Sequence, residues 1–227
     1  MVADNGGPLD SRGCGQDWKA MQDPWEHTEP DADGNLVSPA MILNAYRQRA
    51  FPMADERRGA FSWFRPHVRA VITWDQWKVP ESLVKTMRRS PYRLTIDAAF
   101  PQVIAACADR SSTWISEGIE RLYTALHALG VAHSVEAWDA GGTLVGGCYG
   151  LQIGGCFCGE SMFHRAPDAS KIAVVHLVDH LRRQGFSLLD CQQQTPHMQR
   201  FGAREISDPD YARLLAACPD EVPWIHR

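Results

Sequence analysis

Apolar residues along the chain recur at helical spacing in some segments and alternate with polar residues in others. In residues 116–129 they recur every three or four positions, as on one buried helix face, and Gly130 follows where a helix usually ends. Residues 169–183 show the same spacing, and Gly185 follows them. Further helices are predicted at 38–50, 81–89 and 100–109, with a last helix or turn region after Pro196.

Strands are predicted between these helices. Residues 133–139, 143–153 and 156–163 form three segments joined by two glycine pairs, which is typical of an antiparallel meander. Shorter strands are predicted at 69–73, 92–96 and 187–191. This order predicts an α+β fold in which a mixed sheet is flanked by helices. We expect a loosely packed arm at 1–35, a small N-terminal domain at 36–78 and the main domain at 79–227.

Composition excludes several classes of protein. The 227 residues are 44% hydrophobic and 22% charged, enough to bury a core without disulfides or structural metal. A net charge of −4 argues against nonspecific coating of nucleic acid, although a local basic patch remains compatible with it. No apolar stretch is long enough for a membrane span, and the N-terminus has no apolar core of a signal peptide. The seven cysteines, an odd number, are expected to be reduced, so we predict a cytoplasmic protein without a membrane partner.

Common catalytic motifs are missing. His176 and His180 share a helix face, but Leu177 stands where the glutamate of a zinc helix would be, so no metal is expected. Gly159-Glu160-Ser161-Met162-Phe163 lacks the second glycine of a nucleophile elbow. The sequence contains neither of the glycine-rich nucleotide loops, and no cofactor is predicted.

A cluster of polar residues on the central strands is the strongest indication of a site. Carboxylates within apolar strands are costly to bury unless they are paired or functional. Strand periodicity places Asp190, Gln192 and Gln194 on one side. The other members are His133, Ser134, Glu136, Trp138, Glu160 and Ser161.

Several phrases in order resemble one family, the bacterial leucyl/phenylalanyl-tRNA–protein transferases. The most specific are Phe157-Cys158-Gly159-Glu160-Ser161-Met162-Phe163 and Leu189-Asp190-Cys191-Gln192, within a match over about residues 36–211. Others are Ala45-Tyr46-Arg47, Phe51-Pro52-Met53, Arg69-Ala70-Val71, Ser90-Pro91-Tyr92-Arg93, Thr113-Trp114-Ile115, Ala132-His133-Ser134-Val135-Glu136, Gly146-Gly147-Cys148-Tyr149-Gly150 and Ala169-Ser170-Lys171.

The resemblance implies a GNAT-like catalytic domain that accepts aminoacyl-tRNA. It implies transfer of Leu, Phe or Met to proteins that begin with Arg or Lys, which marks them for degradation. Asp190 and Gln192 correspond to the catalytic pair. The substrate-binding residues implied are Trp114, Phe157, Glu160, Ser161, Met162, Trp63 and Phe64.

An aminoacyl ester is already activated, so its attack by an amine needs neither ATP nor metal. The side-chain carbonyl of Gln192 can accept a hydrogen bond from the amine. Asp190 would either orient Gln192 or stabilise the positive charge that grows on the amine. Two alternatives stay open: an acetyltransferase that uses acetyl-coenzyme A, and a non-catalytic binder of basic N-termini or tRNA ends.

A short run of cations is the candidate tRNA-binding surface. Lys85, Arg88, Arg89 and Arg93 lie within nine residues, close to aromatic side chains. A charge run taken alone is more often a solvated helix face. Lys171, at the predicted start of the longest helix, is the next candidate because a helix N-terminus attracts anions.

Overall fold

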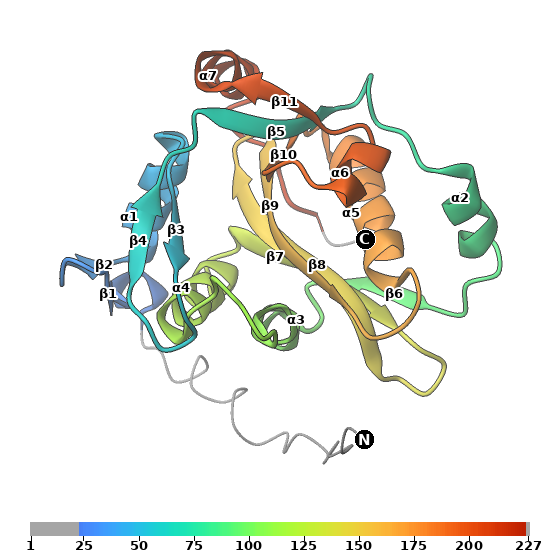
Figure 1. Cartoon of the computed structure of the whole chain (residues 1–227), viewed down its shortest axis with the longest axis horizontal. Coiled ribbons are helices and arrows are strands. Elements are labelled where there is room, and N and C mark those ends of the chain that lie inside the picture. The colour runs from blue at the N-terminus through green and yellow to red at the C-terminus, as the bar shows by residue number, and fades with distance from the viewer. Residues whose placement is uncertain (1–22, 226–227) are drawn as a thin grey trace.

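The structure is a computed structural model, and it describes residues 23–225. Its centre is a seven-stranded sheet in the order β11-β5-β10-β9-β8-β7-β6 (Figure 1). Only β9 and β10 are parallel; every other neighbouring pair is antiparallel. The strands are β5 (Val68–Thr73), β6 (Arg93–Ile96), β7 (Ala132–Trp138), β8 (Leu144–Ile153), β9 (Cys156–His164), β10 (Leu188–Gln192) and β11 (Arg204–Ser207).

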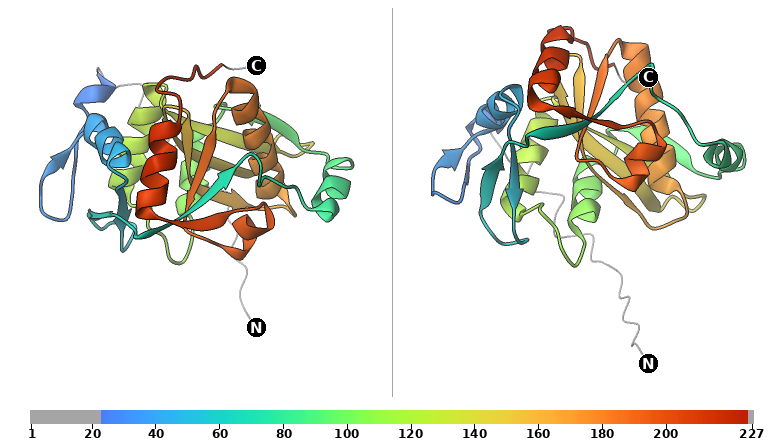
Figure 2. Two further views of the ribbon diagram at one scale, coloured as in Figure 1. Left: turned by 90° about the horizontal axis from the view of Figure 1, so that it is seen from above. Right: turned by 45° about the horizontal axis from the view of Figure 1, so that its top comes forward.

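Helices cover both faces of this sheet (Figures 1 and 2). Helices α3 (Phe100–Ala108) and α4 (Glu117–Ala128) pack on one face, and α5 (Ala169–Gln184) packs on the other. Each face therefore has its own apolar core, one around α3 and α4 and one under α5. The predicted α+β fold, a mixed sheet flanked by helices, is confirmed. The short helix α2 (Glu81–Met87) lies beside α5, and α6 (Pro196–Arg200) follows β10.

Strands β9 and β10 diverge after a short parallel stretch. They pair from Leu188 with Cys156 to Asp190 with Cys158, and no pairing follows. Beyond this point β9 continues for six residues beside β8 alone. The divergence opens a gap between two strands in the middle of the sheet.

The N-terminal region adds a separate small sheet. Its helix α1 (Pro39–Arg47) ends before a two-stranded ribbon of β3 (Phe51–Ala54) and β4 (Phe61–Phe64). The apolar pattern in these strands covers few residues and is interrupted by Pro52, so it did not predict them. A second ribbon, β1 (Glu29–Pro30) with β2 (Leu36–Val37), follows the 3-10 helix η2 (Pro24–Glu26).

Three expectations about organisation change. The strand predicted at 69–73 within the small domain is β5, and it pairs with β10 and β11 inside the main sheet. Residues 29–35 of the expected loose arm are held against α4, because the buried Glu29 accepts two hydrogen bonds from Arg121. Residues 1–22 of that arm lie outside the described residues. Strand β11 and helix α7 (Asp208–Ala217) form where only a helix or turn region was predicted.

No helix among residues 23–225 combines the length and the apolar character that crossing a bilayer requires.

Candidate functional site

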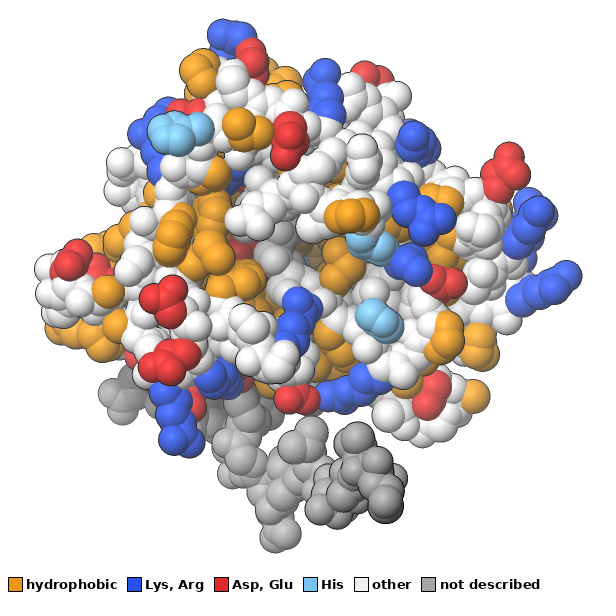
Figure 3. All heavy atoms as spheres, viewed as in Figure 1, with side chains coloured by type: hydrophobic (Ala, Val, Ile, Leu, Met, Phe, Trp, Pro, Cys, Tyr) orange, Lys and Arg blue, Asp and Glu red, His pale blue; other side chains and the backbone are white. Residues whose placement is uncertain are grey.

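A cavity of about 1150 Å³ passes through the gap between β9 and β10. On the α3 side it is lined by aromatic and polar groups, among them Phe51, Trp114 and Ser161. On the α5 side the lining is mainly apolar: Cys148, Met162, Val174, Leu177, Leu189 and Met198. Figure 3 shows this face hollowed, with hydrophobic side chains in the hollow and Lys and Arg side chains around it. The volume exceeds the roughly 300–1,000 Å³ typical of small-ligand pockets, so it suits a large ligand.

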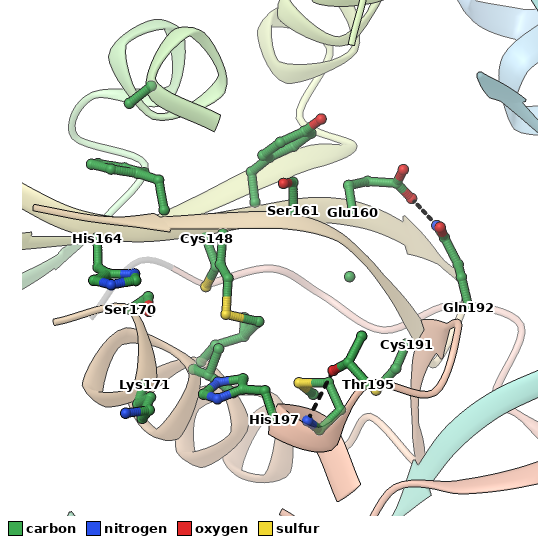
Figure 4. Close-up of a pocket in the computed structure, with 18 of the residues that line it drawn as sticks. Cys148, Glu160, Ser161, His164, Ser170, Lys171, Cys191, Gln192, Thr195 and His197 are labelled. Atoms are coloured by element: carbon green, nitrogen blue, oxygen red, sulfur yellow. Dashed lines mark hydrogen bonds between the residues drawn. The ribbon is translucent and has the colours of Figure 1, made fainter. Parts of the chain in front are cut away.

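A β-bulge places Glu160 at the gap. Tyr149 pairs with Ser161 and Gly150 pairs with Gly159, so Glu160 is the extra residue of β9. Bulges re-aim side chains, and they are frequent beside active sites. Figure 4 shows Glu160 and Ser161 on the same side of β9, with His164 on the other side.

The Glu160 carboxyl group lies in a buried hydrogen-bond network. Its Oε1 accepts from the Tyr46 hydroxyl at 2.7 Å and from the Gln192 Nε2 at 2.7 Å. Its Oε2 accepts from the Tyr123 hydroxyl at 3.4 Å, and the two tyrosine hydroxyls contact each other. Because Nε2 of Gln192 is held by Glu160, the Oε1 atom of Gln192 is left to accept a hydrogen bond from a ligand.

Asp190 does not line the cavity, and its carboxylate holds the backbone of Gln192. Its side chain is fully buried and accepts hydrogen bonds from Arg69 at 2.9–3.2 Å and from the Tyr211 hydroxyl at 2.8 Å. Asp190 Oδ1 also accepts from the backbone N–H of Gln192 at 2.8 Å. Gln192 has a φ of 60°, a left-handed conformation that costs a non-glycine residue about 1–2 kcal/mol. Asp190 therefore holds the strained backbone that carries Gln192.

The pKa of Glu160 is raised from 4.5 to about 8, chiefly by burial and also by the nearby Asp190 charge, while the hydrogen bond from Tyr46 lowers it. Between pH 4.5 and about 8, the Glu160 carboxyl group is protonated in a larger fraction of folded molecules than of unfolded chains. Raising the pH across that window therefore removes stability.

We expect Glu160→Gln to flatten this dependence, because the amide does not titrate. The measurement is the free energy of unfolding by urea at several pH values between 4.5 and about 8. Glu205→Gln, at an exposed position of β11, is the matched control and should keep the wild-type slope. Equal slopes for Glu160→Gln and wild type would contradict this prediction.

The structure brings some of the predicted residues together at the cavity and leaves others outside it. Trp114, Glu160, Ser161, Met162, Gln192 and Lys171 line it. Phe157 does not, since its side chain is buried under α5 against Phe186 and Trp224. Phe157 lies before the bulge in β9 and packs into the core, whereas Met162 lies after the bulge and reaches the cavity.

Trp63 and Phe64 also lie outside the cavity. Trp63 stands opposite Pro52 in the ribbon and packs edge-on against Phe61. Alternation along β3 gives the cavity Phe51 and Met53 from this ribbon instead. Phe64 is 43% exposed at the end of β4.

The predicted cations Lys85, Arg88, Arg89 and Arg93 do not line the main cavity. Lys85 lies in the last turn of α2, Arg88 caps it, and Arg93 begins β6 with its guanidinium over the Trp138 ring. A smaller cavity connects their surroundings to the site, because it is lined by residues of α2 together with Asp168, Lys171 and His197, which also line the main cavity.

Sequence reasoning assigned no role to four residues that build this network: Tyr46, Arg69, Tyr123 and Tyr211. Arg69 could have been found, because a cation within the apolar strand Arg69-Ala70-Val71-Ile72 needs a buried partner, and Asp190 within another apolar strand needs one too. The tyrosines gave no such indication, since buried tyrosine is ordinary in a core.

Residues 23–225 hold no group of three His, Cys, Asp or Glu side chains placed to bind a metal. His180 instead packs against the Trp224 ring at 4.6 Å. Asp168 occupies the cap position of α5 in a left-handed conformation without a capping hydrogen bond. Asp97 lies two residues before the cap position of α3, and its carboxylate accepts hydrogen bonds from the Ser134 N–H and the Trp224 indole.

Two family models match the chain. The one described as leucyl/phenylalanyl-tRNA protein transferase matches residues 71–216, and the one for the N-terminal domain of the same proteins matches residues 35–67. Together they span both the ribbon that lines the cavity and the main sheet.

Curated relatives carry the same description. A leucyl/phenylalanyl-tRNA–protein transferase from Rubrobacter xylanophilus is 48% identical over 180 residues, which are 79% of this chain and 94% of that protein. One from Salinibacter ruber is 44% identical over 187 residues, 82% of each chain. Among solved structures, that of L-PGS from Bacillus licheniformis overlaps in part, with 13% identity, a TM-score of 0.40 and coverage of 63% and 45%. So partial an overlap supports no functional inference.

Proposed function

The chain belongs to the leucyl/phenylalanyl-tRNA–protein transferase family, and we propose that it moves a leucyl, phenylalanyl or methionyl group from tRNA to an N-terminal Arg or Lys. Transfer of an aminoacyl group from tRNA to a protein is the activity that the family name states. The observation that carries our assignment of the site is the position of Gln192, held by Glu160 and Asp190 at the gap that the cavity crosses.

In the proposed reaction the α-amine of the acceptor attacks the ester carbonyl carbon of the aminoacyl-tRNA. A carbon–nitrogen bond forms, and the bond between that carbon and the 3′ oxygen of the terminal adenosine breaks. The amine loses a proton, and the leaving 3′ oxygen takes one up. An α-amine has a pKa of about 7.7–8.0, so a usable fraction is neutral near pH 7.

Gln192 and Asp190 have different roles in this proposal. Gln192 Oε1 accepts a hydrogen bond from the amine and orients its lone pair toward the carbonyl. Asp190 acts through the Gln192 backbone, because its own oxygens are engaged by Arg69, Tyr211 and the Gln192 N–H. Of the two roles left open by the sequence, orientation of Gln192 is therefore the one that these hydrogen bonds support.

The apolar part of the cavity under α5 suits the aminoacyl side chain. Met162 and Met198 are unbranched and adapt to ligands of different shape, which favours Leu, Phe and Met together. On the other side of the gap, the Trp114 indole is available to the adenosine. We also propose that the product is marked for degradation, that the protein acts in the cytoplasm, and that it uses no cofactor.

Leucyl-tRNA should react faster than valyl-tRNA, because a β-branched side chain places a methyl group near the narrow gap and fills less of the pocket. A methylene-scale difference in an apolar pocket is worth about 1–3 kcal/mol, so rejection should be partial, roughly 10–200-fold. The measurement is kcat/KM with one acceptor peptide and both aminoacyl-tRNAs. Equal values would remove the pocket under α5 from side-chain selection.

The Arg88→Ala, Arg89→Ala double variant should bind leucyl-tRNA more weakly and with a smaller dependence on salt. Each phosphate that is no longer neutralised lowers the slope of log K against log salt by about 0.7–0.9. The measurement is tRNA affinity at several salt concentrations. The matched control is Arg182→Ala, Arg183→Ala, which removes two exposed cations from the far end of α5. If both double variants match wild type, the tRNA lies elsewhere.

One assay tests the proposed function as a whole. Radiolabelled leucine on tRNA is incubated with the protein and an acceptor whose first residue is Arg, Lys or Ala. We expect label on the Arg and Lys acceptors and none on the Ala acceptor. Transfer of an acetyl group from acetyl-coenzyme A, or binding of the acceptor or the tRNA without transfer, would replace the proposal with one of the two alternatives.

A further inference from the structure

The first turn of α5 faces the cavity without a cap. Asp168 directs its carboxylate to the Lys171 ammonium and makes no capping hydrogen bond. Among the described residues, no backbone carbonyl accepts from the N–H groups of Ser170 or Lys171. These two N–H groups therefore lack a backbone acceptor at the positive end of a 16-residue helix, and Ser170 and Lys171 of this turn line the cavity.

Two polar groups without a hydrogen-bond partner among the described residues lie beside this turn. Ser170 lines the cavity at 5% exposure, and within residues 23–225 its hydroxyl makes no hydrogen bond. The His197 Nε2 atom is buried and likewise lacks a partner in the part of the chain described. His197 lies in α6 and lines both this cavity and the smaller one beside α2. Figure 4 shows Ser170 and His197 among the side chains around the cavity.

The charges around the turn favour an anion. Lys171, Arg165 and His164 line the main cavity, and Arg200 lines the smaller one. Asp168 lies at the turn itself and is paired with Lys171, and Asp109 and Glu160 are further carboxyl groups that line the main cavity. Burial lowers the pKa of His197, and the nearby Lys171, Arg200 and His164 lower it further, while Asp168 raises it. The lowered pKa favours the neutral imidazole in the free protein, and an anion bound nearby would favour the protonated form.

We propose that Ser170, Lys171, His197 and the first N–H groups of α5 bind the phosphate on the 5′ side of the terminal adenosine of the tRNA. The proposal rests on the proposed function, which supplies the ligand. A phosphate needs several converging donors and a cation, and an uncapped helix N-terminus beside a lysine provides both.

The residues of α5 that line the cavity form a stripe that fits this ligand. Ser170 and Lys171 are followed by Val174 and then Leu177, one and two turns further along the helix. At 1.5 Å per residue the polar and apolar ends of the stripe are about 10 Å apart. One face of α5 thus binds a charged group at its start and an apolar group beyond it. The smaller cavity continues from Lys171 and His197 toward α2, where the rest of the tRNA would lie.

A pair of non-reactive ligands tests the proposal: 3′-leucylamido-3′-deoxyadenosine with and without a 5′-phosphate. In the wild-type full chain the phosphate should tighten binding about tenfold, measured by calorimetry. In Lys171→Met and in Ser170→Ala that gain should fall toward onefold, while the phosphate-free ligand binds as it does to wild type. Arg182→Met is the control for net charge, because it removes a cation from the far end of the same helix, and it should keep the full gain.

The His197 imidazole gives a readout that a folding defect does not imitate. In NMR titrations the phosphorylated ligand should raise the pKa of His197, and the phosphate-free ligand should leave it unchanged. An equal gain from the phosphate in wild type and Lys171→Met would overturn the proposal. The proposal would also be overturned if coenzyme A or inorganic phosphate bound more tightly than the phosphorylated ligand and if that binding depended equally on Lys171. Leucine transfer from whole tRNA is measured in parallel, so that failure of this subsite is distinguished from failure of the proposed function.

Discussion

Asp190→Ala should lower the free energy of unfolding by about 3–5 kcal/mol, because it leaves the Arg69 guanidinium buried without its counter-charge. Arg69 is 1% exposed, and Asp190 raises its pKa although burial alone would lower it. Transfer should fall together with stability, since Gln192 N–H loses its acceptor and its left-handed backbone is no longer held. Urea denaturation gives the first quantity, and single-turnover transfer under folding conditions gives the second.

Two further variants separate the structural effect from the effect on transfer. Asp208→Ala is the matched control: this aspartate likewise forms ion pairs with arginine, here Arg49 and Arg65, but it lies nearer the surface than Asp190. Its loss should cost about 1 kcal/mol or less. The double variant Arg69→Met, Asp190→Leu replaces the buried pair with apolar groups and should recover much of the stability. Transfer should remain low in that double variant, because nothing holds the Gln192 N–H. Recovery of transfer with stability would show that Asp190 has only a structural role.

The sequence predicted the elements that have strong periodicity. Helices α4 and α5 and the β7–β9 meander appear where the apolar spacing placed them, because each has one wide buried face. The strands that were missed are short. Strands β3, β4 and β11 have four residues each, too few to establish a period of two.

The sequence predicted which residues form the candidate site better than it predicted how they are arranged. Period two put Asp190 and Gln192 on one face of a regular strand, and both were expected at the substrate. The actual strand shifts register between them, and Gln192 turns into the left-handed region. The register shift separates their environments: Asp190 stays in the core and Gln192 lines the cavity. A bulge depends on the pairing of strands distant in sequence, and hydrophobic pattern does not encode it.

Loss of the Gln192 side chain should stop transfer without unfolding the protein. In Gln192→Gly we expect the single-turnover rate to fall about 10²–10⁴-fold, the range for one positioned side chain that assists proton transfer. The removal of about 1–2 kcal/mol of left-handed strain should roughly offset the missing hydrogen bond to Glu160, so unfolding changes by about 1 kcal/mol or less. The measurements are single-turnover rate, tRNA affinity and urea denaturation on one preparation.

The split between rate and affinity identifies the role of Gln192. Its amide lies at the gap, and the cations Lys85, Arg88, Arg89 and Arg93 do not line that cavity, so tRNA affinity should stay near the wild-type value while the rate falls. Gln184→Ala, at the far end of α5, is the control for loss of a glutamine side chain and should leave both unchanged. A Gln192→Gly variant that transfers leucine at the wild-type rate would assign the hydrogen bond to the attacking amine to another group. The Ser161 hydroxyl, on the same side of β9 as Glu160, would be the next candidate (Figure 4).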